Sequence, residues 1–424
     1  MIRQLALATA VLVSHAFAQD ALVEAQECRP RAGLPNFFSK MAKPGVPIKV
    51  AYLGGSITAA PGWRVQSLEH LQSLAPGAKL SEVHAAIGGT GSDLGVFRLG
   101  QDVLSAKPDL LFVEFAVNDG GAPVEQIQRC MEGIVRQTWR ALPECDICFV
   151  YTVSEPFIAP LVDGKFQRSA SAMEAVANHY GIPSIHMGLE VARLAKAGRL
   201  EWRGKLPKTD AEKAAAGDKF IFAGDGVHPH TETGHKLYTD SIVRSLPAIR
   251  DAGKTPAPHP LAEPLRADHY ERARLVPIQE ATLSAGFSKP GAKDPFASRF
   301  SKLPNLHKAT APGETLAFTF KGTRAAIYDI VGPDCGQVIV TLDDQPPRTI
   351  PRFDAYCTSH RLSTFLIASD LPDAVHRVKI EIHRDQPDKA AILAQRKQTI
   401  DDPARFNATA FYPGGLLLLG ELVK

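Results

Sequence analysis

Polar residues suited to acyl-transfer chemistry stand in four short motifs that lie far apart in the chain: GGSIT, IGGTGSD, VND and DGVHPH. A serine hydroxyl such as that of Ser56 becomes a good nucleophile once a base takes its proton, and histidine, here His228, is the residue type most often used as that base. Asp225 stands three residues before His228, where it could hold the imidazole and balance its charge. Together these residue types suit the cleavage of an ester through an acyl-enzyme.

Each motif also has a simpler interpretation. A serine after two glycines is usually a turn residue, and Asn118, which is followed by Asp-Gly-Gly, could form a turn or a cap. His230 and His235 compete with His228 for the role of the base, but neither has an aspartate three residues earlier. We expect His235, inside a helical pattern, to be a structural hydrogen-bonding partner and His230 to line a cleft. No further ligand cluster accompanies the HPH sequence, so neither a catalytic metal nor a cofactor is expected.

The segments that must position these motifs alternate between strands and helices. Short apolar runs predict strands: IKVAYLG, SEVHAAIG, PDLLFVEFAV, ICFVYTV and IPSIHMG. Segments of helical period predict helices: VQSLEHLQSL, DLGVFRLGQDVLSA, VEQIQRCMEGIVRQTWRAL, SASAMEAVANHYG and TGHKLYTDSIVRSLPAIR. This alternation predicts a parallel sheet covered by helices on both faces. Ligands bind such sheets at the carboxyl ends of the strands, so the four motifs are expected to converge at one edge.

The chain from about Val50 to His235 resembles the SGNH hydrolases, the esterase superfamily also called GDSL-like, in the order of these four motifs. Four blocks match in order: Ser56 stands where the family has its nucleophile, Gly89 where it has the oxyanion glycine, Asn118 where it has the oxyanion asparagine, and Asp225 with His228 where it has the Asp-x-x-His pair. The resemblance implies a flavodoxin-like three-layer α/β/α domain with a Ser-His-Asp triad. It also implies an oxyanion hole formed by the backbone N–H groups of Ser56 and Gly89 and the side-chain amide of Asn118.

The sequence departs from the family pattern in two places. Gly55 replaces the aspartate of the usual first block, and Ala116 replaces the glycine of the third. Neither replacement removes a catalytic group, so the resemblance supports the hydrolase class more firmly than any particular substrate.

Other residues near the motifs are candidates for substrate contacts. Trp63, Arg64, Trp202 and His230 could contact a sugar ring or a substrate carboxylate, although aromatic side chains serve equally well in packing. The charged stretch 201–222 interrupts the last strand-helix unit and is a candidate cleft wall or lid.

The composition and the N-terminal segment of the chain limit where the protein acts and what it binds. Arg3, a short apolar run and Ala16-Phe17-Ala18 predict a signal peptide cut after Ala18, and hence a secreted or periplasmic protein without a membrane span. The 48 basic and 45 acidic side chains nearly cancel, and no basic tract points to nucleic acid. We predict these segments: signal peptide 1–18, lead-in 19–45, catalytic domain 46–250, proline-rich linker 251–270, and β-rich domain 271–424.

The β-rich domain is expected to be an antiparallel, jelly-roll-like β-sandwich. Its apolar runs TLAFTFKG, RAAIYDIVG, GQVIVTLDD, RLSTFLIAS, HRVKIEIHR and GLLLLGELV are separated by turn residues. It holds no tryptophan and few tyrosines. We therefore expect this domain to shape access of a polymer to the cleft without performing chemistry.

The chain contains six cysteines. Cys335 and Cys357 are predicted to form a disulfide, with free thiols buried as small apolar groups as the alternative. Cys145 and Cys148 form a CDIC sequence that leads into a strand, whereas a redox motif should open a helix.

These observations favour a secreted serine esterase that removes O-acetyl groups from an oligo- or polysaccharide. An esterase for aryl or other acyl esters and a sugar O-acetyltransferase are alternatives on the same fold. A non-catalytic carbohydrate-binding protein is a further alternative, but a relic would be expected to lose members of the catalytic set, and all are present.

Overall fold

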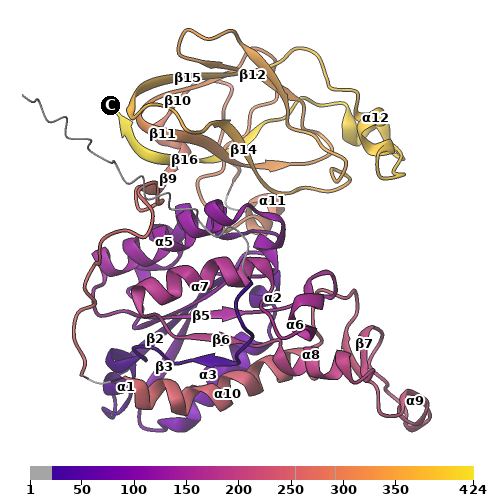
Figure 1. The fold of residues 1–424 in the computed structure, drawn as a ribbon. Helices are drawn as coiled ribbons and strands as arrows, with labels where there is room; N and C mark the ends of the chain where they lie inside the picture. Colours follow the sequence, from indigo (N-terminus) through magenta and orange to yellow (C-terminus); the bar gives the residue numbers. More distant parts are fainter. Residues whose placement is uncertain (1–21, 254, 292) are drawn as a thin grey trace, which may run out of the picture.

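The computed structural model describes residues 22–253, 255–291 and 293–424, and these residues form two domains with a six-stranded, an eight-stranded and a two-stranded β-sheet (Figure 1). The predicted signal peptide lies outside the described residues. Among the described residues, the helices are too short or too polar to span a membrane. We call the elements from β1 to α10 the α/β domain and those from β9 to β16 the β domain.

The α/β domain is built on a six-stranded sheet in the order β1-β6-β5-β4-β2-β3. Its strands are β1 (Cys28–Arg29), β2 (Pro47–Gly54), β3 (Lys79–His84), β4 (Leu110–Glu114), β5 (Asp146–Tyr151) and β6 (Ser184–His186). Strands β2 to β6 are parallel, and the two-residue β1 pairs antiparallel with β6. The parallel strands follow the flavodoxin-like order, which confirms the predicted fold class.

Helices cover both faces of this sheet (Figure 1). Helices α4 (Ser92–Asp102), α5 (Val124–Ala141) and α7 (Arg168–Tyr180) pack together on one face, and α3 (Trp63–Leu74) packs with α10 (Gly234–Ala252) on the other. The predicted strands and helices of this region are all present. Sequence analysis missed β1, α1 (Pro35–Met41), α6 (Ala159–Val162) and α8 (Leu189–Lys196).

The β domain contains an antiparallel eight-stranded sheet in the order β13-β12-β15-β11-β16-β9, with β10 and β14 also paired to β11. Its strands are β9 (Ala273–Pro277), β10 (Thr282–Leu283), β11 (Thr315–Val331), β12 (Gln337–Leu342), β13 (Arg348–Pro351), β14 (Arg361–Ala368), β15 (Ala374–Ile382) and β16 (Tyr412–Val423). Two short helices, α11 (Pro295–Arg299) and α12 (Lys389–Ala394), accompany them. This arrangement is consistent with the predicted β-sandwich.

Strand β11 replaces two separately predicted strands. Its register with β16 shifts between Gly322 and Arg324. Its first part pairs with β15 and its second part with β14. A bulge lets one long strand bend and take different partners along its length, so the predicted break is a bend within a strand.

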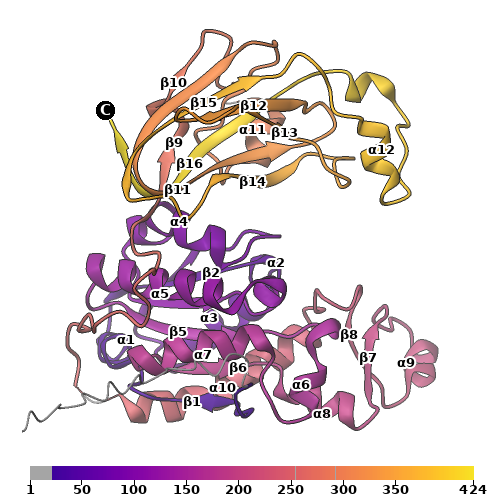
Figure 2. The ribbon, with the colours of Figure 1, turned by 45° about the horizontal axis from the view of Figure 1, so that its top comes forward.

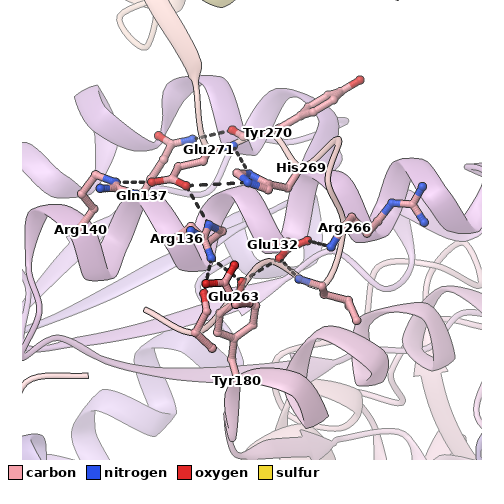
Figure 3. Close-up of polar contacts among 12 residues, drawn as sticks. Glu132, Arg136, Gln137, Arg140, Tyr180, Glu263, Arg266, His269, Tyr270 and Glu271 are labelled. Carbon is pink, nitrogen blue, oxygen red and sulfur yellow. Dashed lines mark hydrogen bonds and ion pairs between the residues drawn. The ribbon is translucent and has the colours of Figure 1, made fainter. Parts of the chain in front are cut away.

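The segment that joins the two domains is held tightly against α5 (Figure 3). The buried Glu132 carboxylate accepts hydrogen bonds from the backbone N–H groups of Leu265 and Arg266, at 2.6 and 3.0 Å, and from the Tyr180 hydroxyl. Arg136 donates to the Glu271 carboxylate at 2.7 Å. The predicted linker is therefore irregular in structure but fixed in place.

Apolar side chains of both domains form one continuous cluster. Phe97 of α4 packs edge-on against Tyr270, with ring centroids 6.2 Å apart. The same cluster includes Phe300, Leu303 and Tyr328 of the β domain, all buried. Contacts between buried apolar side chains define a core. The β domain is therefore joined to the α/β domain by shared packing, and Figure 2 shows it seated over α4.

The prediction of a Cys335–Cys357 disulfide is wrong for this structure, because both residues are free thiols. Cys335 donates to the backbone oxygen of Ile330 at 3.6 Å, and Cys357 donates to the Asp354 carboxylate at 3.4 Å. The two thiols lie in different apolar clusters, Cys335 in the cluster shared by the domains and Cys357 beside Phe353. Each thiol thus has its own local partner, as the alternative of buried free cysteines requires.

We predict that Cys335 and Cys357 are both alkylated after unfolding without a reductant. Burial raises the pKa of the Cys357 thiol to about 12 and raises that of Cys335 well above its usual value. Few thiolates are therefore available for oxidation in the folded protein. Peptide mass spectrometry after denaturation in iodoacetamide would measure this. A disulfide-linked peptide pair containing both residues would contradict it.

Candidate active site

The strand ends of the parallel sheet bring the predicted motifs to one edge. Strand β2 ends at Gly54, and α2 (Ser56–Ala59) begins with the predicted nucleophile. The backbone N–H of Ile87, in the loop after β3, donates to the Gly54 oxygen at 3.0 Å. This bond places the Gly88-Gly89 loop beside the start of α2.

Ser56, His228 and Asp225 form a continuous hydrogen-bonded chain. The His228 Nε2 lies 2.8 Å from the Ser56 Oγ, and the His228 Nδ1 lies 2.6 Å from the Asp225 Oδ2. A carboxylate can only accept hydrogen bonds, so Nδ1 carries the proton in this pair. In the neutral ring Nε2 is then the acceptor for the Ser56 hydroxyl. The geometry is that of a serine nucleophile with an oriented base.

The Asp225 carboxylate is held in its charged form. Partial burial by itself would raise its pKa, but the His228 ring and the backbone N–H groups of His228 and Val227 outweigh this and lower the pKa to about 2. Those backbone groups donate to Oδ1 at 2.8 and 2.9 Å. A carboxylate charged throughout the neutral range stabilises the imidazolium that forms when His228 takes a proton.

The predicted oxyanion residues lie in segments next to the start of α2. A side chain at Gly88 would lie 3.6 Å from the Ser56 Cβ, so this loop runs in contact with the nucleophile. Gly89 has a φ of +74°, a conformation that favours glycine. A Cβ at Gly55 would overlap the side-chain amide of Asn118, so that amide lies against the residue before Ser56. Gly55, one of the two departures from the family pattern, therefore makes room for Asn118.

A buried carboxyl group that sequence analysis missed connects three of these strand ends. Glu114, the last residue of β4, is fully buried, and it accepts hydrogen bonds from the hydroxyl of Thr58 at 2.9 Å and from that of Thr152 at 2.6 Å. It also accepts from the backbone N–H of Ala116 at 3.2 Å. Thr58 lies in α2, and Ala116 precedes Asn118, so Glu114 ties the nucleophile's turn to the asparagine loop. A charged residue inside the run PDLLFVEFAV was the available signal.

Asp119 is a second buried carboxyl group beside Asn118. Its Oδ1 accepts from the backbone N–H of Ser92 at 3.0 Å, which links the asparagine turn to the start of α4. Burial raises the pKa of Asp119 to about 7. These contacts fix the Asn118 turn against the segment that follows Gly89.

His235 and His230, the two other candidates for the base, both have structural partners. The His235 Nδ1 accepts from the backbone N–H of Trp63 at 3.2 Å, as expected of a structural partner. Burial lowers the pKa of His235 to about 4, so its ring is neutral. The His230 ring donates to the backbone oxygen of Gly204 at 2.8 Å and thereby braces the loop that carries His228. This contact gives His230 a structural partner, and the cleft-lining role of this half-buried side chain stays a prediction.

Trp63 and Arg64 are not placed to contact a substrate. Trp63 is fully buried and packs edge-on against Tyr52 and Phe112. Arg64 is buried, pairs with Glu82, and donates to the backbone oxygen of Thr58 at 3.0 Å. Both residues belong to the packing of α3 against the sheet, which corrects the prediction of substrate contacts.

Trp202 lies in the inserted stretch, which forms β7 (Leu200–Arg203), α9 (Asp210–Ala216) and β8 (Phe220–Ala223). Its ring packs edge-on against Phe222, at 5.0 Å between centroids. Figures 1 and 2 show β7 and α9 projecting from the α/β domain. Strand β8 leads directly into the Asp225 loop, and Arg203 pairs with Glu155 at 2.7 Å beside Gly226. The insertion therefore adjoins the loop that carries Asp225, and its role as a cleft wall or lid stays a prediction.

Among the residues that the structure describes, no group of three or more His, Cys, Asp or Glu side chains is arranged to hold a metal ion. The arrangement of Ser56, His228 and Asp225 needs none, because it contains a nucleophile, a base and an anionic partner.

Residues 52–237 match the GDSL-like lipase/acylhydrolase family model. The α/β domain is therefore a GDSL-like, or SGNH, hydrolase domain, and the protein is of the carboxylic ester hydrolase class. Comparison with curated proteins gave no match.

Two solved structures share both domains with this chain. A two-domain esterase active on acetylated mannans, crystallised with mannopentaose, has a TM-score of 0.69 at 19% identity, over 93% of this chain and 97% of that chain. A further structure of a two-domain esterase active on acetylated mannans has a TM-score of 0.70 at 20% identity, over 92% and 97%. At this identity the likeness shows the common fold, including the appended β domain.

Proposed function

We propose that this protein is a secreted serine esterase that removes O-acetyl groups from a polysaccharide, with acetylated mannan as the first candidate. The observation that carries the proposal is the chain of two short hydrogen bonds from Ser56 through His228 to Asp225, at 2.8 and 2.6 Å. Export rests on the predicted signal peptide.

In the proposed reaction, the Ser56 hydroxyl attacks the acetyl carbonyl while His228 takes its proton. The carbonyl oxygen becomes an oxyanion, stabilised by the backbone N–H groups of Ser56 and Gly89 and by the Asn118 amide. Collapse expels the sugar alkoxide, which receives the proton from His228, and leaves an acetyl group on Ser56. Water, activated by His228, then releases acetate and restores the serine.

Two features support a polymeric substrate. The His228 and Asp225 side chains are about half exposed, at 51% and 55%, so the reacting groups lie on an open surface that a chain could approach. The two-domain esterases active on acetylated mannans share the fold over more than nine-tenths of this chain. The alternatives of an aryl esterase and an acetyltransferase use the same groups and differ in the acceptor.

We predict that the protein releases acetate from acetylated mannan faster than from acetylated xylan or pectin at equal acetyl content. Acetate release would be measured enzymatically on this panel, with p-nitrophenyl acetate as the small-ester reference and the Ser56→Ala variant as the blank. Hydrolysis of p-nitrophenyl acetate with no release from any polymer would contradict the polysaccharide assignment. Preference for xylan or pectin would contradict only the mannan assignment.

A further inference from the structure

Lys302 of the β domain makes a direct hydrogen bond to the catalytic sheet. Its Nζ donates to the backbone oxygen of His84 at 2.7 Å, across a separation of 218 residues. His84 is the last residue of β3, whose following loop carries Gly89. The β domain thus contacts the origin of the predicted oxyanion loop.

The segment around Lys302 is rigidly placed. Phe300 and Leu303, on either side of it, are buried in the apolar cluster shared by the two domains. The backbone N–H of Leu303 donates to the oxygen of Phe300 at 2.8 Å, which closes a turn around Lys302. The lysine stem is therefore fixed at its base, and its ammonium group can hold a carbonyl in position.

The next backbone oxygen, that of Ala85 just after β3, is also bound by a cation. The fully buried Arg98 of α4 donates through Nη1 to the oxygen of Ala85 and through Nη2 to that of Gly54, the latter at 3.3 Å. Gly54 comes two residues before Ser56. Successive carbonyls at the end of β3 are thus bound by one cation from each domain, and one of these cations also holds the strand that carries the nucleophile.

The His84 side chain extends the contact to the helical turn that begins with the predicted nucleophile. Its Nε2 lies 3.3 Å from the backbone oxygen of Ala59, the last residue of the α2 turn that begins at Ser56. A carbonyl oxygen only accepts hydrogen bonds, so the His84 Nε2 carries the proton in this pair. Burial, followed by the positive charge of Arg64, lowers the pKa of His84. Displacement of His84 would therefore move both the oxyanion loop and the serine turn.

We propose that Lys302 is a positioning residue for ester cleavage, so that the β domain supports kcat on small esters as well as access of a polymer. This proposal rests on the proposed esterase function of the Ser56 site. It adds to the expectation that the β domain shapes polymer access without performing chemistry. Misplacing reacting groups by about 1 Å can cost about 10²-fold in rate, so the loss of one anchor is expected to lower kcat by about tenfold.

The test is the kinetics of full-length Lys302→Met, which keeps the stem and removes the ammonium group. We expect kcat for p-nitrophenyl acetate to fall by about tenfold with KM within about twofold, and a similar fall on acetylated mannan. Lys302→Arg, which keeps the cationic donor, should retain kcat within about threefold. Lys321→Met, at an exposed lysine of β11 in the same domain, should match the unmodified protein. If Lys302→Met does not fold, the kcat of Lys302→Gln is compared with those of Lys302→Arg and Lys321→Met in its place.

Unchanged kcat in a folded Lys302→Met protein would overturn the proposal, as would a loss confined to the polymer. An equal loss in Lys321→Met would also overturn it. Ser56→Ala, assayed in parallel, separates this result from the proposed function. If Ser56→Ala is active, the assigned site is wrong; if it is inactive while Lys302→Met keeps kcat, only the role of Lys302 fails.

Discussion

Ser56→Ala is expected to lower kcat for p-nitrophenyl acetate by ~10⁴-fold or more while the protein stays folded, because the members of a triad act as a unit. The Ser56 Oγ is the only atom removed, and it lies 2.8 Å from the base that would activate it. The alanine keeps the Cβ that faces the Gly88 loop. The measurement is steady-state kinetics, together with the melting temperature of each variant.

Two controls make the Ser56 result specific. Ser73→Ala changes an exposed serine near the end of α3 and should leave kcat unchanged. A serine-directed phosphonofluoridate should add its mass to the peptide that contains Ser56 and to no other. His228→Ala in the Ser56→Ala background should cause little further loss, because the base has no nucleophile to activate. A folded Ser56→Ala protein with wild-type activity would contradict the nucleophile assignment.

The parallel sheet could be predicted from the sequence because its strands are buried on both faces. Each strand therefore appears as an apolar run that differs clearly from the amphipathic helices. The motifs after these runs also predicted the hydrogen-bonded chain of Ser56, His228 and Asp225, since the carboxyl ends of parallel strands share one edge. Strand β1 could not be found in this way, because two residues have no periodicity and β1 pairs with a strand far away in the sequence, Cys28 with Ile185.

The residues predicted to contact the substrate show a different limit of prediction from the sequence. Trp63 and Arg64 follow the nucleophile closely in sequence, but both point into the packing of α3. A tryptophan presents the same apolar surface to a sugar ring and to a protein core, so its residue type could not separate the two uses. The predicted disulfide failed for a related reason, because spacing shows that two cysteines could meet but not whether each thiol has its own partner.

The hydrogen bonds that hold the site residues in place could not be predicted from the sequence. They are made by a buried carboxyl group or by residues from distant segments. Glu114 connects Thr58 with Thr152, and Lys302 reaches β3 from the other domain. Sequence patterns report which face of an element is buried, not which polar group meets which carbonyl. The charged residue inside an apolar run singles out Glu114, but the partners of Glu114 and Lys302 emerge only from the folded chain.

The lack of a side chain at Gly55 explains how the Asn118 amide can take one fixed position in the predicted oxyanion hole. Any side chain at this position would occupy the space of the Asn118 amide. The backbone around Asn118 is also fixed by two hydrogen bonds. Asp119 accepts one from the backbone N–H of Ser92, and the backbone N–H of Ala116 donates the other to Glu114. Asn118 thus lies in a fixed turn, which suits the proposed role of its amide as an oxyanion donor.

Asn118→Ala is accordingly expected to lower kcat by about 10²- to 10³-fold with little change in KM, because one of three oxyanion donors is lost. Gly55→Ala should cause a loss of similar size, since its methyl group would displace the amide without removing it. Gly121→Ala, in the same turn but facing open space, is the matched control and should keep kcat within about twofold. The measurement is kcat and KM for p-nitrophenyl acetate for all three variants. If Asn118→Ala loses less than a few-fold, or if Gly121→Ala loses as much as Gly55→Ala, the amide is not the donor that stabilises the oxyanion.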